Sequence, residues 1–324
     1  MTRFILHVGT HKTGTTSFQN AMHTERGALM RCGLWYPDLG RGTAHHGLLT
    51  GQVLLDPAFH VDDPSAALDA IVDRASREDL TVLLSSEEFS RSGPQGARLH
   101  WIVERLRRAG PVQIVVTVRG QLAFLQSIYV EISRKAPQPP PRVFVETAMR
   151  RRMAAGLHLN HNVLLDHLEA ARPDDGIAVL DYERARRHAS GLFGSILTAA
   201  GLDPALRGNE RRPRKDANVS APALAVALAN TFASPTVPGE RQLAHLVRLL
   251  DEVAGDRSQA IFTRAERAAI DDLFAQANAR FVARVRRGDP DFSLTTGMPG
   301  DVLHRDDLSR DLIARAEALF RDAA

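Results

Sequence analysis

The feature that most constrains the fold is a glycine-bounded turn near the start of the chain, residues 9–17 (GTHKTGTTS). It follows a short apolar segment, residues 4–8, and leads into a stretch that can form a helix. Glycines let the backbone curl so that its N–H groups point inward, and the start of a helix adds partial positive charge. The pattern therefore predicts an anion-binding turn between a strand and a helix, with a phosphate as the expected occupant.

The spacing of this turn separates two classes of phosphate-binding loop. Gly9 and Gly14 occupy the two glycine positions of the nucleoside-triphosphatase loop, G-x-x-x-x-G-K-[ST]. Thr15 stands at the lysine position of that loop, whereas Lys12 lies inside the turn and would meet the ligand from a different side. This shift argues against an ATPase or GTPase. A P-loop kinase, which would need a lysine at position 15 and an acid that holds magnesium, is kept as the enzyme alternative.

Residues 12–16, Lys-Thr-Gly-Thr-Thr, resemble the first loop of the sulfotransferases that use 3′-phosphoadenosine 5′-phosphosulfate (PAPS). The resemblance implies that the loop binds the 5′-phosphosulfate end of PAPS, with Lys12 near the oxygen that bridges phosphorus and sulfur. His11 adjoins this lysine and either contacts the nucleotide or only orients the loop. The implied nucleotide-binding residues of the loop are His11, Lys12, Thr13, Gly14, Thr15, Thr16 and Ser17.

A second segment points to the same ligand. The β-branched run 113–118 reads as a buried parallel strand that ends at Arg119, just before a helix-like stretch. Ser127 follows eight residues after the arginine, a little over two helical turns, so that both could face one side. The sulfotransferase resemblance implies that this pair holds the 3′-phosphate of PAPS, and Tyr129 fits a tyrosine often found nearby. Gln121 replaces a proline that is common in the family, and a solvated edge arginine is the structural alternative.

Two carboxylates and a histidine pair are candidates for the acid–base group. The apolar run 80–84 delivers Glu87 and Glu88 to the same end of a parallel sheet. Sulfuryl transfer needs a base that takes the proton of the attacking group. Resemblance to heparan-type sulfotransferases implies Glu87 as this base, with Glu88 second. Other branches use histidine, so His46, beside His45 in a polar loop, stays open, as does a purely solvated role for all of them.

A basic segment late in the chain is the remaining nucleotide-binding candidate. It contains Arg211, Arg212, Arg214 and Lys215 and lacks apolar periodicity. It resembles the basic loop that closes over the adenosine and 3′-phosphate in PAPS sulfotransferases, which implies Arg212, Arg214 and Lys215 as ligands. Its end also reads as a helix start, with Ser220 as N-cap and Pro222 in the first turn.

The order of segments predicts an α/β fold. Apolar runs at 4–8, 80–84, 113–118 and 176–180 alternate with helix-like stretches, which is the pattern of a doubly wound parallel sheet with flanking helices. The sulfotransferase resemblance implies a P-loop NTPase-like version of that fold. With 324 residues and 44% hydrophobic content, the chain fits a single sulfotransferase domain over 1–324. Residues from about 222 to 324 are expected to form a mostly helical C-terminal extension of it.

The composition of the chain restricts which ligands, metal sites and compartments are expected for the protein. A net charge of +3 suits an anionic cofactor but is too mild to indicate nucleic acid. Cys32 is the only cysteine, so neither an intramolecular disulfide nor a cysteine zinc cluster can form. No apolar run reaches the roughly 18 residues that a membrane helix needs, and no signal-peptide core follows Met1. We therefore expect a cytoplasmic protein of bacterial type without a membrane span, and a homo-oligomer is possible.

Together these patterns predict a sulfotransferase that moves a sulfuryl group from PAPS to a hydroxyl or amine of a small molecule, lipid or glycan. Lys12 would stabilise charge on the departing oxygen, Glu87 would accept the proton, and no metal would be required. The non-enzyme alternative is a PAPS-binding or nucleotide-binding protein that keeps the phosphate cradle but does not turn over.

Overall fold

The computed structural model describes residues 1–93, 96–207, 221–298 and 300–323. The chain divides into two compact units, each built from segments that are separate in the sequence. The first unit comprises Met1–Arg119, Asn160–Glu210 and Ala277–Thr295, and the second comprises Gly120–Leu159, Arg211–Gln276 and Thr296–Ala324. The glycine turn, both candidate carboxylates and Arg119 belong to the first unit, whereas Ser127 belongs to the second.

The first unit is built on a five-stranded sheet in the order β2-β3-β1-β4-β7, and every pair in it is parallel. The strands are β1 (Arg3–Gly9), β2 (Leu34–Trp35), β3 (Thr81–Ser85), β4 (Val112–Val118) and β7 (Ile177–Asp181). The central strand β1 pairs Leu6 with Leu84 on one side and with Ile114 on the other. The predicted α/β class and its four strands are confirmed. The two-residue strand β2 was not predicted.

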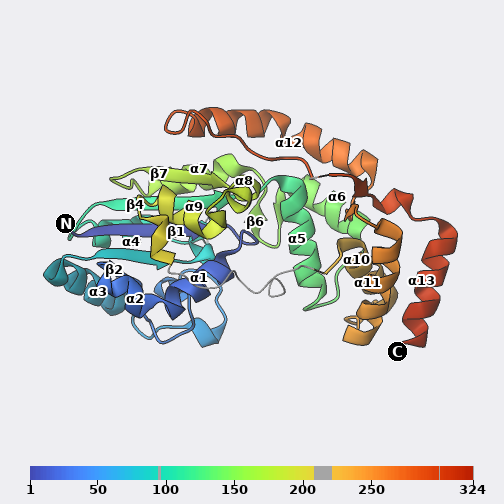
Figure 1. Ribbon diagram of the computed structural model, residues 1–324, viewed down its shortest axis with the longest axis horizontal. Coiled ribbons are helices and arrows are strands. Elements are labelled where there is room, and N and C mark those ends of the chain that lie inside the picture. Colours follow the sequence, from blue (N-terminus) through green and yellow to red (C-terminus); the bar gives the residue numbers. More distant parts are fainter. Residues whose placement is uncertain (94–95, 208–220, 299, 324) are drawn as a thin grey trace. The chain divides into compact units, whose positions relative to one another are not determined.

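Helices cover both faces of this sheet, as Figure 1 shows for the labelled elements. One face carries α3 (Pro64–Glu78), α4 (Leu99–Leu106) and α7 (His161–Ala170). The other carries α1 (Thr15–Thr24), α2 (Arg26–Arg31) and α9 (Gly191–Ala199). The short helix α8 (Tyr182–Arg187) follows β7, and 3₁₀ turns lie at η1 (His46–Leu49), η2 (Pro57–Phe59), η3 (Glu87–Ser90) and η4 (Pro204–Arg207).

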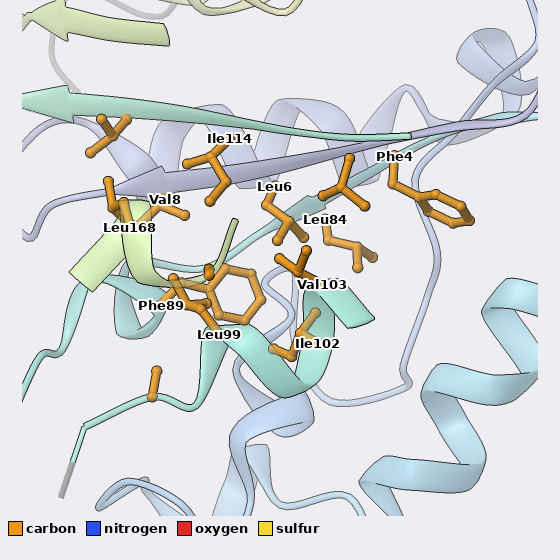
Figure 2. Packing of buried hydrophobic residues seen from close by; sticks show 14 of the residues in the cluster. Phe4, Leu6, Val8, Leu84, Phe89, Leu99, Ile102, Val103, Ile114 and Leu168 are labelled. Carbon is orange, nitrogen blue, oxygen red and sulfur yellow. The ribbon is translucent and has the colours of Figure 1, made fainter. Parts of the chain in front are cut away.

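The strand β1 explains why the sheet is buried on both sides. Phe4, Leu6 and Val8 are fully buried toward α3, α4 and α7 (Figure 2), whereas Ile5 packs toward α1 and α9. Side chains alternate between the faces of a strand, so a strand covered on both faces reads as a continuous apolar run. Each such side chain contributes about 1.5–3 kcal/mol by burial. The one polar exception in the middle of β1 is His7.

The second unit is mainly helical. Its elements are α5 (Gln121–Ser133), α6 (Pro141–Arg151), β5 (Met153–Ala154), β6 (Leu157–His158), α10 (Ala223–Ala233), α11 (Glu240–Ala254), β8 (Ser258–Gln259), β9 (Val302–Leu303), η5 (Arg305–Asp307) and α13 (Arg310–Asp322). The helix α12 (Arg264–Val285) contributes its residues up to Gln276 to this unit and the rest to the first. The single domain with a helical extension therefore stays a prediction, because α5 and α6 share the second unit with the helices beyond residue 222.

Two local predictions in the second unit have clear outcomes. The helix-like run at 121–133 is the helix α5. The predicted start of the later helix is wrong, because α10 begins at Ala223 and Pro222 is its N-cap, with extended ψ of 127°. Ser220 lies outside the described residues. None of the helices in the described chain combines the length and apolar character of a membrane-spanning segment.

Candidate anion-binding and acid–base site

The glycine turn has the backbone of an anion cradle. β1 ends at Gly9 and α1 begins at Thr15, and the N-cap Gly14 is left-handed, with φ of 76°. Lys12 is left-handed as well, with φ of 66°, which costs a non-glycine residue about 1–2 kcal/mol. The first N–H groups of a helix have no acceptor within it, and Gly14 offers no side chain to cap them. The arrangement fits the anion-binding turn that the sequence predicts.

The turn is tied to the neighbouring strand β4. The backbone N–H and the hydroxyl of Thr10 both donate to the carbonyl oxygen of Thr117, at 3.2 and 2.9 Å. The hydroxyl of Thr13 donates to the carbonyl of Thr10 at 2.5 Å, and Thr13 is only 1% exposed. Thr13 therefore supports the turn through its side chain instead of presenting that hydroxyl to a ligand.

The other hydroxyl residues of the turn divide between packing and exposure. Thr15 is buried, and its Cγ2 lies 2.0 Å from where a side chain on Gly9 would begin, so only glycine fits there. Thr16 and Ser17 are exposed on the first turn of α1, and Lys12 is half-buried. The two exposed hydroxyls and the lysine are therefore the side chains of the turn best placed to meet an anion.

Arg119 lies next to the turn and contacts its backbone. Its Nη1 donates to the carbonyl oxygen of Lys12 at 3.4 Å, and its Nε and Nη2 lie 3.2 and 3.1 Å from Glu183 Oε1. Its guanidinium also stacks over the ring of Tyr182, 4.8 Å from the centroid. The structure thus brings the predicted arginine to the predicted loop. Its pairing with Ser127, in the other unit, stays a prediction.

A polar cluster forms at the end of β3, beside α1. Ser86 caps η3, where its hydroxyl accepts the N–H of Glu88 at 3.2 Å. Gln19 of α1 donates to Glu87 Oε2 at 2.8 Å. His46 Nδ1 lies 2.7 Å from Ser86 Oγ, and its Nε2 lies 3.9 Å from Glu87 Oε2. Two of the predicted acid–base candidates, Glu87 and His46, are therefore neighbours.

Glu88 has different surroundings. Its carboxylate pairs with Arg91, and its Oε1 lies 3.5 Å from His11 Nε2. The structure thus places Glu88 beside the turn through His11, whereas Glu87 is held by the neutral amide of Gln19.

His45 fixes the loop that carries His46. Its Nε2 lies 2.9 Å from the carbonyl oxygen of Pro37, which can only accept, so Nε2 holds the proton. Its Nδ1 is then free of hydrogen and accepts the N–H of Ser85 at 3.0 Å. Burial lowers the pKa of His45 to about 4. The neutral ring therefore joins the loop to β3, and His46 alone of the pair faces Glu87.

Three residues that contribute to this site were not among the predicted site residues. His7 lies on β1 with Nδ1 2.8 Å from Ser85 Oγ, and burial lowers its pKa to about 4. Gln19 reaches Ser85 Oγ at 3.3 Å as well as Glu87. Glu183 follows β7, and its position just after an apolar run is the one signal that the sequence offers. The contacts of these residues with Ser85, Glu87 and Arg119 join positions that are distant in sequence.

Other sequence candidates are not placed at this site. The basic residues Arg211, Arg212, Arg214 and Lys215 lie outside the described residues. Tyr129 is fully buried in the second unit, where its hydroxyl donates to Pro139 O at 3.2 Å and accepts from Asn230 at 3.0 Å. Within the described ranges, no group of three or more His, Cys, Asp or Glu side chains is arranged to hold a metal ion.

Comparisons with known proteins give weak likenesses. No family model and no curated protein matches the chain. A sulfotransferase from Alicyclobacillus acidocaldarius is 12% identical, with a TM-score of 0.48, covering 87% of this chain and 95% of that one. A sugar kinase from Janibacter sp. HTCC2649 is 17% identical, with a TM-score of 0.29, over 64% of this chain and 98% of that one. A structure from the PezAT toxin–antitoxin system of Streptococcus pneumoniae is 14% identical, with a TM-score of 0.30, over 70% of this chain and 85% of that one. Because every one of these TM-scores is below 0.5, the function of the chain has to be argued from its own residues.

Proposed function

We propose that this protein is a PAPS-dependent sulfotransferase whose acceptor is a hydroxyl or amine of a small molecule, lipid or glycan. The observation that carries the proposal is the turn between β1 and α1. It has the backbone of a phosphate cradle, with Lys12 inside it and Thr15 where a kinase needs lysine. A phosphosulfate fits this donor set, because helix amides, exposed hydroxyls and an ammonium all favour a singly bonded, anionic oxygen.

The nucleotide contacts follow from the position of each donor. Lys12, Thr16, Ser17 and the first amides of α1 would hold the 5′-phosphosulfate, while Thr13 and Thr15 would keep the turn in shape. Arg119 would meet the 3′-phosphate next to the turn, and Ser127, in the second unit, stays a predicted ligand of that phosphate. Arg212, Arg214 and Lys215, which lie outside the described residues, would contact the adenosine, and His11 would orient the turn.

PAPS supplies an activated sulfate, whose bond to the bridging phosphate oxygen breaks as the acceptor attacks sulfur in line. The acceptor oxygen or nitrogen forms its bond to sulfur, and the electron pair of the broken S–O bond leaves with adenosine 3′,5′-bisphosphate. Lys12 would stabilise the charge that develops on that oxygen. The proton of the acceptor would pass to Glu87, which Gln19 holds by a 2.8 Å hydrogen bond. His46, 3.9 Å away, is the alternative base.

A cytoplasmic, bacterial enzyme that needs no metal remains part of the proposal, and its oligomeric state is left open. Its acceptor class rests on the loop resemblance alone. A kinase acting on ATP with magnesium and a binding protein without turnover are the outcomes that would replace the proposal.

The test is transfer of labelled sulfate from PAPS to a cell extract, with mass spectrometry of whatever gains the label. We expect transfer by the natural protein, loss of at least about a hundredfold in Lys12→Ala, and little change in Lys135→Ala. Lys135 is a matched control, because it is an exposed lysine paired with Glu131 outside the first unit. Full activity in Lys12→Ala would rule out the role assigned to this lysine.

A further inference from the structure

Glu183 is a buried carboxylate whose backbone is fixed from two directions. It lies in the first turn of α8, and its side chain is only 7% exposed. The N-cap of that helix, Asp181, accepts the N–H of Arg184 at 2.8 Å. Asp181 also accepts the N–H and hydroxyl of Thr295 at 2.8 and 2.9 Å. These hydrogen bonds fix the backbone between β7 and α8. They hold the Glu183 side chain in a buried position, where a carboxylate needs partners.

Its two oxygens serve two arginines. Oε1 lies 3.2 and 3.1 Å from Nε and Nη2 of Arg119, and Oε2 lies 3.3 Å from Nη2 of Arg186. The Arg119 side chain is 19% exposed, and that of Arg186 is 57% exposed, so the contact with Arg119 is the better shielded of the two. Shielding from water strengthens an ion pair. The ion pair with Arg119 is thus the stronger of the two that Glu183 makes.

Arg119 is in turn fixed against the turn. Its Nη1 donates to the carbonyl oxygen of the left-handed Lys12, and Tyr182 lies under its guanidinium. The ring of Tyr182 also lies 3.7 Å from where a side chain on Gly14 would begin. Glu183 therefore holds one edge of the guanidinium, Tyr182 holds one face, and the carbonyl oxygen of Lys12 holds Nη1. All of these contacts lie next to Lys12 and Gly14, the two left-handed residues of the turn.

A guanidinium has five N–H donors in a planar fork. Nε donates to Glu183 Oε1 and Nη1 donates to the carbonyl oxygen of Lys12, whereas Nη2 lies 3.1 Å from Glu183 Oε1 as part of the ion pair. Within the described part of the chain, at least one further N–H on each terminal nitrogen has no hydrogen-bond partner, and a pair of donors of that kind matches two oxygens of a phosphate. The carboxylate at the Nε and Nη2 edge and a phosphate at the terminal edge can therefore bind the same guanidinium together.

We infer that Glu183 is a positioning residue, which holds Arg119 so that its terminal edge faces the 3′-phosphate of the nucleotide. The inference rests on the proposed function, in which Arg119 meets that phosphate. Glu183 does not touch the nucleotide and moves no proton. It orders a long side chain before the ligand arrives, so that binding does not have to order it.

Calorimetry with two nucleotides isolates this effect. Adenosine 3′,5′-bisphosphate and adenosine 5′-monophosphate differ only in the 3′-phosphate, so the ratio of their Kd values reports on the group that Arg119 would bind. We expect the natural chain to favour the bisphosphate and Glu183→Gln to reduce that ratio about tenfold. General damage to the fold would weaken both nucleotides alike and leave the ratio unchanged.

Three further variants complete the test. Arg186→Gln removes only the exposed partner of Glu183 and should leave the ratio within about twofold. Arg119→Gln should abolish the preference, and adding Glu183→Gln to it should change the ratio no further. If thermal melting shows that Glu183→Gln does not fold, Glu183→Asp keeps the charge but withdraws it by one methylene, and it should lower the ratio to a smaller extent.

The outcomes are distinct. A ratio that stays at the natural value in the folded Glu183 variant, while Arg119→Gln abolishes it, would overturn the inference and leave the proposed function standing. The same holds if Glu183→Gln lowers the ratio further in the Arg119→Gln background. A natural chain that binds both nucleotides equally would contradict the proposed function itself.

Discussion

At the scale of single residues, the site separates groups that look equivalent in the sequence. Glu87 and Glu88 are neighbours, yet one is held by the neutral amide of Gln19 and the other by Arg91. His45 and His46 are neighbours too, yet one joins two backbone segments and the other faces a carboxylate. The adjacent positions differ because η3 and η1 turn successive side chains in different directions.

This difference predicts unequal effects of two matched substitutions. Glu87→Gln keeps the size of the side chain and removes its basicity, so the rate of sulfuryl transfer should fall by about 10²–10⁴. Glu88→Gln should lower the rate less than tenfold, because that carboxylate would only orient His11. The measurement is kcat with a fixed acceptor, together with the Kd for adenosine 3′,5′-bisphosphate, which neither variant should change much. A larger loss of kcat in Glu88→Gln than in Glu87→Gln would show that Glu88, and not Glu87, is the base.

At the scale of elements, the junction between β1 and α1 depends on Gly14 in a way that the turn at Gly33 does not depend on its glycine. A side chain on Gly14 would begin 2.6 Å from Leu192 Cδ2, at a φ of 76°. Gly33 has the same φ of 76°, but nothing lies within 4 Å of the corresponding point. The two glycines therefore share the same backbone strain and differ in the space around them.

Substitution by alanine should separate these two effects. Gly33→Ala should cost about 1–2 kcal/mol of unfolding free energy, the strain of a left-handed non-glycine residue. Gly14→Ala should cost about 1–3 kcal/mol more, because Leu192 must also move. Urea unfolding measures both values, and nucleotide binding should weaken only in Gly14→Ala. Equal free-energy losses in the two variants would show that the packing of Leu192 against the turn is unimportant.

At the scale of the whole molecule, the sheet could be predicted and the side-chain network could not. Four strands were readable because strands buried on both faces are apolar and β-branched, whereas the two residues of β2 are too few to form a pattern. The turn was readable because its chemistry is local. The contacts of Gln19 with Glu87 and of Arg119 with Glu183 join residues 68 and 64 positions apart, which periodicity does not reveal. The division into units was hidden for the same reason, since 120–159 joins residues beyond 222.

The central claim, that the turn after β1 binds the nucleotide product of sulfuryl transfer, is tested most directly by calorimetric titration of the full chain. We predict that adenosine 3′,5′-bisphosphate binds at one site without any divalent cation, and that Lys12→Ala weakens this binding about tenfold or more. Binding of ATP only in the presence of magnesium, with no heat from the bisphosphate, would contradict the account.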